Sequence, residues 1–249
     1  MTEELERQLT DLMEMQEGRS HDVKTLRAAL PEELREYVTK MGGSLDFPCF
    51  RHPLYYAVPY FGSKFEREAL LSCIEQKCKR VEEARADGDI STVINMHERP
   101  YRLEALSNFV SESPEQFYPV MGEVWTGSEN IWQNLDMWKM LWHQADHLGH
   151  TRLTMDEKDL EFLSVVQKAG TVEIYRGAEP RRNVRGLSWT TDRKKAEWFS
   201  RRFRAGHTYQ VTVGVQDIIA AFVGLGESEV ILRPRRLKNL KANEIRQLS

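Results

Sequence analysis

The sequence changes character near Gly170, and this change constrains the fold more than any other feature. Before it, apolar residues recur at the spacing of amphipathic helices; after it, apolar runs are short and separated by turn-forming residues, as is typical of strands. The charge changes at the same place: residues 1–170 contain 19 Lys and Arg against 30 Asp and Glu, whereas residues 171–249 contain 16 against 8. We predict an α+β chain with an acidic helical domain over residues 1–168 and a basic, strand-rich domain over residues 169–249.

Composition excludes several classes of protein. With 41% hydrophobic and 29% charged residues, the chain fits neither a disordered nor a fibrous protein. No apolar run approaches the ~20 residues that a membrane-spanning helix needs, and the first residues are acidic, unlike a secretion signal. The three cysteines have no ligand-like spacing, which is typical of reduced thiols. We therefore expect a cytoplasmic protein with no membrane partner.

Capping residues and apolar spacing mark the helices of the acidic part. The clearest helix begins after Ser63 and ends near Asp87. Residues 2–16 and 32–40 also have helical spacing, whereas residues 47–61, rich in Pro and aromatics, suggest an irregular packed connector.

Tryptophans dominate a further helix that is expected to begin at Ser128. Its apolar stripe consists of Trp132, Leu135, Trp138 and Trp142. Indoles can stack on nucleobases, but the helical period is explained by core packing, and we expect these side chains to be buried.

Two histidines on the same helix raise the question of a metal. His143 and His147 are four residues apart, the spacing that places two zinc ligands on one helix face. Gln144, however, stands where a zinc protease needs a glutamate. Histidines are also favoured near the carbonyl end of a helix. We therefore expect no metal.

The basic part contains candidate ligand-binding groups on two expected strands. Arg176 ends an apolar run and is followed by Gly177, so its guanidinium is held on rigid backbone that a phosphate can approach closely. A guanidinium pairs bidentately with phosphate oxygens and keeps its charge when partly desolvated. Ser188 and Thr190 alternate along the next strand, so both hydroxyls face the same side.

Two carboxylates follow in the sequence. Glu227 and Glu229 are two residues apart where a strand begins, which places them beside one another on one face. Paired carboxylates cleave glycosidic bonds: one stabilises an oxocarbenium-like sugar and the other handles the proton of the nucleophile. Together with the anion clamp and the hydroxyls, the pair predicts a site for a phosphate-bearing glycoside.

In this order, Tyr175-Arg176-Gly177, Ser188-Trp189-Thr190 and Glu227-Ser228-Glu229 resemble the Arg-Ser-Glu class of mono-ADP-ribosyltransferases. The resemblance covers about residues 171–233. It implies a split β-sandwich, here minimal because only eleven residues separate Arg176 from Ser188. It also implies transfer of ADP-ribose from NAD, as co-substrate, to a macromolecular acceptor.

The resemblance implies a role for each matching residue. Arg176 would contact the NAD phosphates, and Gly177 would hold the nicotinamide amide through its backbone. Ser188 would orient the carboxylate of Glu229. Glu229 would grip the nicotinamide ribose and stabilise the cation that forms as nicotinamide leaves.

Three more residues complete the expected site. Glu227 would position or deprotonate the acceptor. Thr190 and Trp189 would bind the co-substrate, with the indole of Trp189 available to stack on nicotinamide.

The acceptor remains open at this point. A glutamate at the position of Glu227 often accompanies a protein arginine acceptor in the family, whereas the basic residues 171–249 suit RNA or DNA. Some related members are bacterial toxins or phage-conflict effectors; if this chain is one of them, its acidic helical domain would bind an antitoxin or a regulatory partner. The alternative is a non-enzymatic nucleic-acid-binding or regulatory protein with a degenerate version of this fold. The arginines would also be explained if they docked on the protein's own acidic helices.

Overall fold

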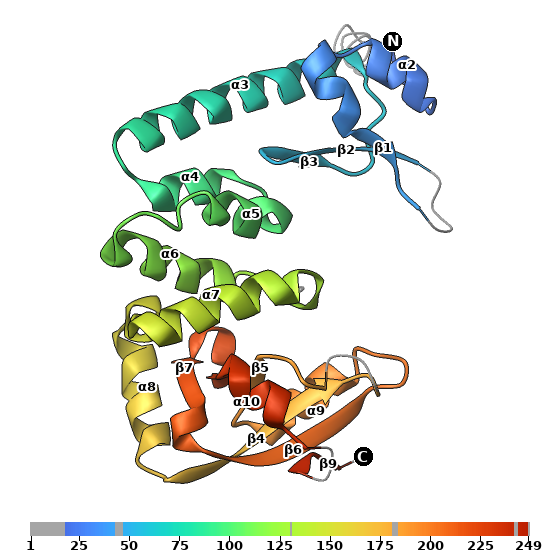
Figure 1. Cartoon of the computed structure of the whole chain (residues 1–249). Helices are drawn as coiled ribbons and strands as arrows, with labels where there is room; N and C mark the ends of the chain where they lie inside the picture. The colour runs from blue at the N-terminus through green and yellow to red at the C-terminus, as the bar shows by residue number, and fades with distance from the viewer. Residues whose placement is uncertain (1–17, 43–46, 130, 181–183, 242–243, 249) are drawn as a thin grey trace, which may run out of the picture. The chain divides into compact units, whose positions relative to one another are not determined.

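The computed structural model describes residues 18–42, 47–129, 131–180, 184–241 and 244–248 (Figure 1). The helix expected at residues 2–16 lies outside them. The chain divides into two compact units, Met1–Phe109 (unit 1) and Val110–Ser249 (unit 2). Helices occur together with antiparallel sheet in both units, so the predicted α+β class is confirmed. Among the described residues, no helix is long and apolar enough to cross a membrane.

Unit 1 contains a small antiparallel sheet. Its strands are β1 (Val38–Lys40), β2 (Pro48–His52) and β3 (Tyr55–Ala57), in the order β1-β2-β3. Phe50 pairs with Val38 on one side and with Ala57 on the other, and its ring is fully buried. The helix expected over residues 32–40 ends early, as the 3₁₀ helix η1 (Glu32–Tyr37). The prediction of an irregular connector over residues 47–61 is also wrong, because this segment forms the strands β2 and β3. Phe50 and Tyr60 from it are buried in the core of the unit.

Helices complete unit 1. The prediction of a helix after Ser63 is confirmed by α3 (Lys64–Ala86). The Ser63 hydroxyl accepts from the Glu66 amide at 3.2 Å, and the Ser63 amide donates to the Glu66 carboxylate at 2.9 Å, which is a capping box. The other helices are α2 (Val23–Ala28), α4 (Ile90–Met96), η2 (Arg99–Tyr101) and α5 (Arg102–Ser107).

Unit 2 is built on a sheet of six described strands, all paired antiparallel in the order β7-β8-β5-β4-β6-β9. The strands are β4 (Thr171–Ala178), β5 (Ser188–Thr190), β6 (His207–Gly214), β7 (Ile218–Phe222), β8 (Glu229–Leu232) and β9 (Arg246–Gln247). β4 pairs with β6 along its whole length but with β5 only at Tyr175 and Thr190. The sheet therefore has two halves, β7-β8-β5 and β4-β6-β9, which are joined at a single residue pair.

Helices pack on the edge strand β7, all five residues of which are buried. These helices are α6 (Pro114–Thr126), α7 (Leu135–Leu148) and α8 (Glu157–Gln167). Asp159 of α8 accepts a hydrogen bond from the Val223 amide at 2.8 Å, and the Trp142 ring lies 6.2 Å from that of Phe222. Because these helices share a core with the sheet, the compact units divide at Phe109, whereas the change from helices to strands lies near residue 168. The shorter elements are η3 (Ile131–Asn134), η4 (Thr151–Thr154), α9 (Arg193–Ser200), η5 (Val215–Asp217), η6 (Gly224–Gly226) and α10 (Pro234–Asn239).

Three indoles form the centre of the helical layer. The Trp125 ring lies edge-on to the rings of Trp138 and Trp142, with centroids 4.9 and 5.4 Å apart, and all three side chains are buried. Core packing is therefore confirmed for Trp138 and Trp142. For Trp132 it is wrong: this side chain is 56% exposed, because α7 begins only at Leu135 and Trp132 lies in η3.

The change of charge near residue 170 does not coincide with the boundary between the two units. Residues 110–249 contain 20 Lys and Arg against 18 Asp and Glu, so unit 2 is nearly neutral as a whole. Some of its arginines form ion pairs with acidic residues of the same unit. Arg233 contacts Asp146 of α7 at 3.2 Å, and Arg236 contacts Asp217 at 3.3 Å. Ion pairs within the unit therefore neutralise part of the basic charge. Further cations lie near α9 and α10.

Candidate active site

A small pocket of about 80 Å³ lies in unit 2 where β4 and β5 separate. The residues predicted from the sequence all border it: Arg176, Gly177, Ser188, Trp189, Thr190, Glu227 and Glu229. Tyr175 and two residues of α9, Ala196 and Phe199, complete its lining. The pocket is smaller than the ~300–1,000 Å³ of typical ligand sites. It can hold one end of a dinucleotide-sized molecule, with the remainder lying outside.

Glu229 is an acid of the pocket with a strongly shifted pKa. It is the first residue of β8 and pairs directly with Thr190, so both side chains and that of Ser188 lie on one face of the sheet. Its carboxylate accepts hydrogen bonds from the Ser188 side chain and from the indole Nε1 of Trp125, the latter at 3.1 Å. Burial raises the pKa of Glu229 to about 7, with a further increase from Glu227, although both hydrogen bonds and the charge of Arg176 oppose this rise.

Arg176 occupies the gap between the two halves of the sheet. Its Nη1 donates to the main-chain carbonyl of Ser188, and its guanidinium packs against Gly186, where any side chain would collide with it. The guanidinium thus hydrogen-bonds a main-chain carbonyl of β5 at a position where β5 no longer pairs with β4. Burial lowers the pKa of Arg176 to about 10, while the charge of Glu229 raises it, so the group is cationic at neutral pH.

Glu227 reaches the pocket from a turn rather than from the start of a strand. It follows η6 directly, and Ser228 has a left-handed backbone with φ of 46°, which brings the chain into β8 at Glu229. Burial raises the pKa of Glu227, while Lys195 and Arg202 lower it. Two acids with raised pKa values therefore border one pocket: the charge of Arg176 acts on Glu229, and those of Lys195 and Arg202 act on Glu227.

The Ser188-Trp189-Thr190 strand supports this turn. The Thr190 hydroxyl donates to the Glu227 carbonyl at 2.5 Å and accepts from the Asp192 amide at 3.0 Å, while the Thr191 amide donates to the Ser228 carbonyl at 3.1 Å. Thr190 borders the pocket, but its hydroxyl donates its hydrogen bond to the main chain of Glu227. Trp189 also borders it, but its indole is 2% exposed and donates to the Gly186 carbonyl at 2.9 Å, as a core side chain.

Trp125 is the site residue that sequence reasoning missed. It lies on α6, 104 positions before the carboxylate that it contacts, and outside the region of family resemblance. Its only signal in the sequence is membership of a tryptophan-rich helical region, which indicates a core and nothing about a carboxylate. Phe199 of α9 also lines the pocket, where its ring is partly buried.

Gly177 supports the pocket by permitting a close approach of α9. A Cβ at this position would meet the Ala196 carbonyl oxygen and the Ser200 amide nitrogen, which belong to the helix backbone and cannot rotate away. We expect Gly177→Ala to lower the free energy of unfolding by about 1–3 kcal/mol, as overpacking does, in a urea denaturation experiment. Gly224→Ala is the matched control, because nothing lies within 4 Å of its added Cβ. Equal stability of the two variants would contradict the close packing.

The two histidines do not gather further ligands. The rings of His143 and His147 lie 6.3 Å apart on α7. No group of three or more possible metal ligands occurs among the residues that the structure describes.

Comparison of this chain with protein-family models, with curated proteins and with solved structures gives no match.

Proposed function

We propose that this protein is a mono-ADP-ribosyltransferase that transfers ADP-ribose from NAD to a macromolecular acceptor. One observation carries the proposal: an arginine, a serine and a glutamate from three strands converge on one pocket, and the serine hydrogen-bonds the glutamate. The separation of β4 from β5 beyond one residue pair further supports the split-sandwich form of the fold.

The proposed reaction breaks the bond between the nicotinamide nitrogen and C1′ of its ribose, and nicotinamide leaves with the bonding electron pair. Glu229, as a carboxylate, stabilises the positive charge that develops on the ribose. Ser188 and Trp125 hold that carboxylate from two directions. Glu227 accepts the proton of the acceptor group as that group forms the new bond to C1′.

Arg176 supplies the positive charge for the phosphates of NAD, and the amide backbone at Gly177 is available to the nicotinamide end. A pocket of about 80 Å³ suits that end alone. The rest of NAD would then lie outside, on the surface that continues from the pocket.

The test is incubation of the purified full-length protein with NAD labelled in the ADP-ribose part, alone and with cell lysate. Release of free nicotinamide and retention of the label on macromolecules are the expected results. Treatment of the products with nuclease or with protease then identifies the acceptor. If no nicotinamide is released and no label is retained in either fraction, the proposal fails.

A non-enzymatic nucleic-acid-binding or regulatory function is the second candidate. It is favoured by one observation: the Arg176 guanidinium already bonds to the protein's own Ser188 carbonyl, as a structural group would. It predicts no nicotinamide release under any condition, so the same assay separates the two functions.

The pH dependence of nicotinamide release follows from the two shifted groups. Glu229 must be ionised to stabilise a cation, so kcat/KM should rise with pH through an apparent pKa near 7. It should fall again above about 10, where Arg176 loses its charge. A rate profile from about pH 4 to about pH 11 measures both limbs. A rise near pH 4.5, the ordinary value for glutamate, would show that a different carboxylate controls the rate.

A further inference from the structure

One face of α9 continues outward from the pocket as a stripe of aromatic and basic side chains. Lys195, Trp198 and Phe199 follow the i, i+3, i+4 spacing that places residues on one face of a helix, and Arg202 lies in the turn directly after α9. The Trp198 indole is 51% exposed, and the charged ends of Lys195 and Arg202 lie 5.7 and 5.1 Å from its ring. We call these four residues the α9 stripe.

The α9 stripe is joined to the proposed catalytic carboxylates. Phe199 lines the pocket together with Glu227, and its ring packs edge-on against that of Trp198 at 5.0 Å. Lys195 and Arg202 both act electrostatically on Glu227. Among the described residues, neither cation has an acidic partner at ion-pair distance, in contrast to Arg193 on the same helix, which pairs with Glu197 at 2.8 Å. The two cations are therefore available to an external anion.

We propose that the α9 stripe binds the acceptor and that this acceptor is a nucleic acid strand, with an unpaired base stacked on Trp198 and its phosphates against Lys195 and Arg202. The assignment of the strand as acceptor rests on the proposed transferase function; the binding surface itself does not. A half-exposed indole can stack on a base of any kind, and the two cations that lie over its ring can neutralise the backbone phosphates.

The charges near Glu227 argue against the other macromolecular acceptor. An arginine side chain of a protein would have to bring its positive charge next to Lys195 and Arg202, which repel it. A phosphodiester backbone is attracted by the same two groups. Nucleobase nitrogens and ribose hydroxyls carry no such charge, so they can approach Glu227 without this cost.

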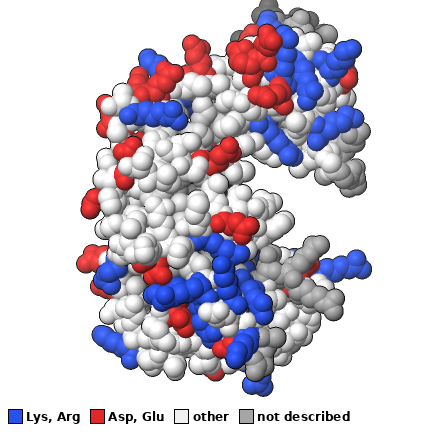
Figure 2. Space-filling model, in the orientation of Figure 1, with Lys and Arg blue, Asp and Glu red and all other residues white. Residues whose placement is uncertain are grey.

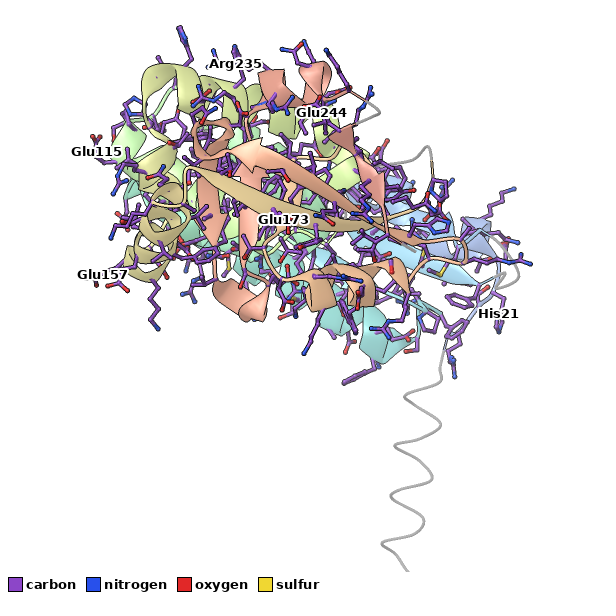
Figure 3. The ribbon with its side chains drawn as sticks, turned by 90° about the horizontal axis from the view of Figure 1, so that it is seen from below. His21, Glu115, Glu157, Glu173, Arg235 and Glu244 are labelled. Atoms are coloured by element: carbon purple, nitrogen blue, oxygen red, sulfur yellow. The ribbon has the colours of Figure 1, made fainter. Side chains whose placement is uncertain are left out.

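A second basic surface provides the comparison for an experiment. It is a cleft of about 530 Å³ between α7 and α10, with the cations Lys139, Arg185, Arg235 and Lys238 in its lining and no aromatic ring other than that of His143. Lys and Arg side chains gather over α10 on this face (Figure 2). Arg235 extends from α10 at the outer edge of unit 2, and α10 lies on the opposite side of the sheet from α9 (Figures 1 and 3). Charge alone would favour this cleft, whereas base stacking favours the α9 stripe.

The test is fluorescence anisotropy of a labelled 20-nucleotide single-stranded RNA of mixed sequence, with the full-length protein and no NAD. Trp198→Ala should weaken binding about 5- to 150-fold, the range that loss of one stacked base produces. Trp198→Phe should retain most of the affinity. Trp132→Ala is the matched control, because Trp132 is 56% exposed in the same unit but does not line the pocket. It should bind within about twofold of wild type.

The charge contribution is measured by salt dependence. Replacing Lys195 and Arg202 together by Ala should reduce the slope of log K against log salt by about 1.4, at ~0.7 per phosphate contact on a single strand. Arg235→Ala/Lys238→Ala should leave the slope unchanged. The reverse pattern would place the strand in the α7–α10 cleft and overturn the proposal.

Failure of this inference and failure of the proposed function give different results. If the protein releases nicotinamide and labels only protein, or if Trp198→Ala binds RNA as Trp132→Ala does, the inference is wrong and the transferase stands. If no nicotinamide is released while RNA binding depends on Trp198, the transferase is wrong and the binding surface stands. Thermal melting of each variant checks that it is folded.

Discussion

Glu229→Gln is expected to reduce the rate of nicotinamide release by at least about 10²–10³-fold, the loss that follows removal of one preorganised electrostatic group from a transition state. The amide has the shape of the carboxylate and can still accept hydrogen bonds from Ser188 and from Trp125, so the pocket should keep its form. What is lost is the negative charge that faces the developing ribose cation. KM for NAD should change much less than kcat, because the charge acts mainly in the transition state.

Glu161→Gln is the control for this experiment. Glu161 lies exposed on α8, so the same chemical change there should leave the rate as in wild type. A Glu229→Gln variant that keeps wild-type activity would remove the carboxylate from the mechanism and, with it, the main support for the proposed function.

Glu229→Gln should also raise the free energy of unfolding at alkaline pH. The pKa of Glu229 is about 7 in the folded protein and 4.5 as its ordinary value, so the folded state binds the proton more tightly. Stability therefore falls as the pH rises from about 4.5 to 7, and the full penalty is present above 7. At 1.36 kcal/mol per pH unit this penalty is at most about 3.4 kcal/mol, and the partial exposure of the residue reduces it. Urea denaturation at pH 8 should find Glu229→Gln more stable than wild type, and at pH 4.5 the difference should vanish.

Trp125→Phe should have the second large effect. It tests whether Trp125 positions the carboxylate of Glu229. Phenylalanine keeps an aromatic ring among Trp138 and Trp142 but cannot donate to Glu229. Because this hydrogen bond lowers the pKa of Glu229, its removal should move the acidic limb of the rate profile to higher pH. A hydrogen bond to a charged group contributes ~1.5–3 kcal/mol, which corresponds to a shift of about one to two pH units. The rate at pH 6.5 should fall accordingly, and the rate above the new pKa should recover.

The control must separate positioning from packing. Trp138→Phe makes the same change in the same buried cluster at a ring that does not hydrogen-bond Glu229, so it should lower stability without moving the rate profile. Trp125→Ala removes the packing as well and should cost about 3–5 kcal/mol of unfolding free energy. If Trp125→Phe and Trp138→Phe have the same rate profile, Trp125 has a structural role only.

Local patterns account well for the strands that contain the site. β4, β5, β6 and β8 lie where short apolar runs between turn signals, at residues 171–175, 186–191, 207–215 and 229–232, predict strands. β7 was not predicted, because its five consecutive apolar residues lack the alternation of a half-buried strand. β2 was not predicted either, since Pro48 and neighbouring aromatics indicated an irregular connector, and only pairing with β1 and β3 makes this segment extended.

The sequence by itself determined the α+β class, which follows from local helix and strand patterns, and the shared face of Ser188 and Thr190, because side chains alternate along a strand with a period of two. It also singled out Arg176, Ser188, Glu227 and Glu229 as candidates, but not the turn that carries Glu227. Only the tertiary structure decided that they border one pocket, since strand order and register bring together segments that are more than 50 positions apart. It also decided that α6 belongs with the sheet and that Trp125 holds Glu229 across 104 positions. The raised pKa of Glu229 has the same origin: burial by distant segments removes water from the carboxylate, and no local pattern encodes that loss.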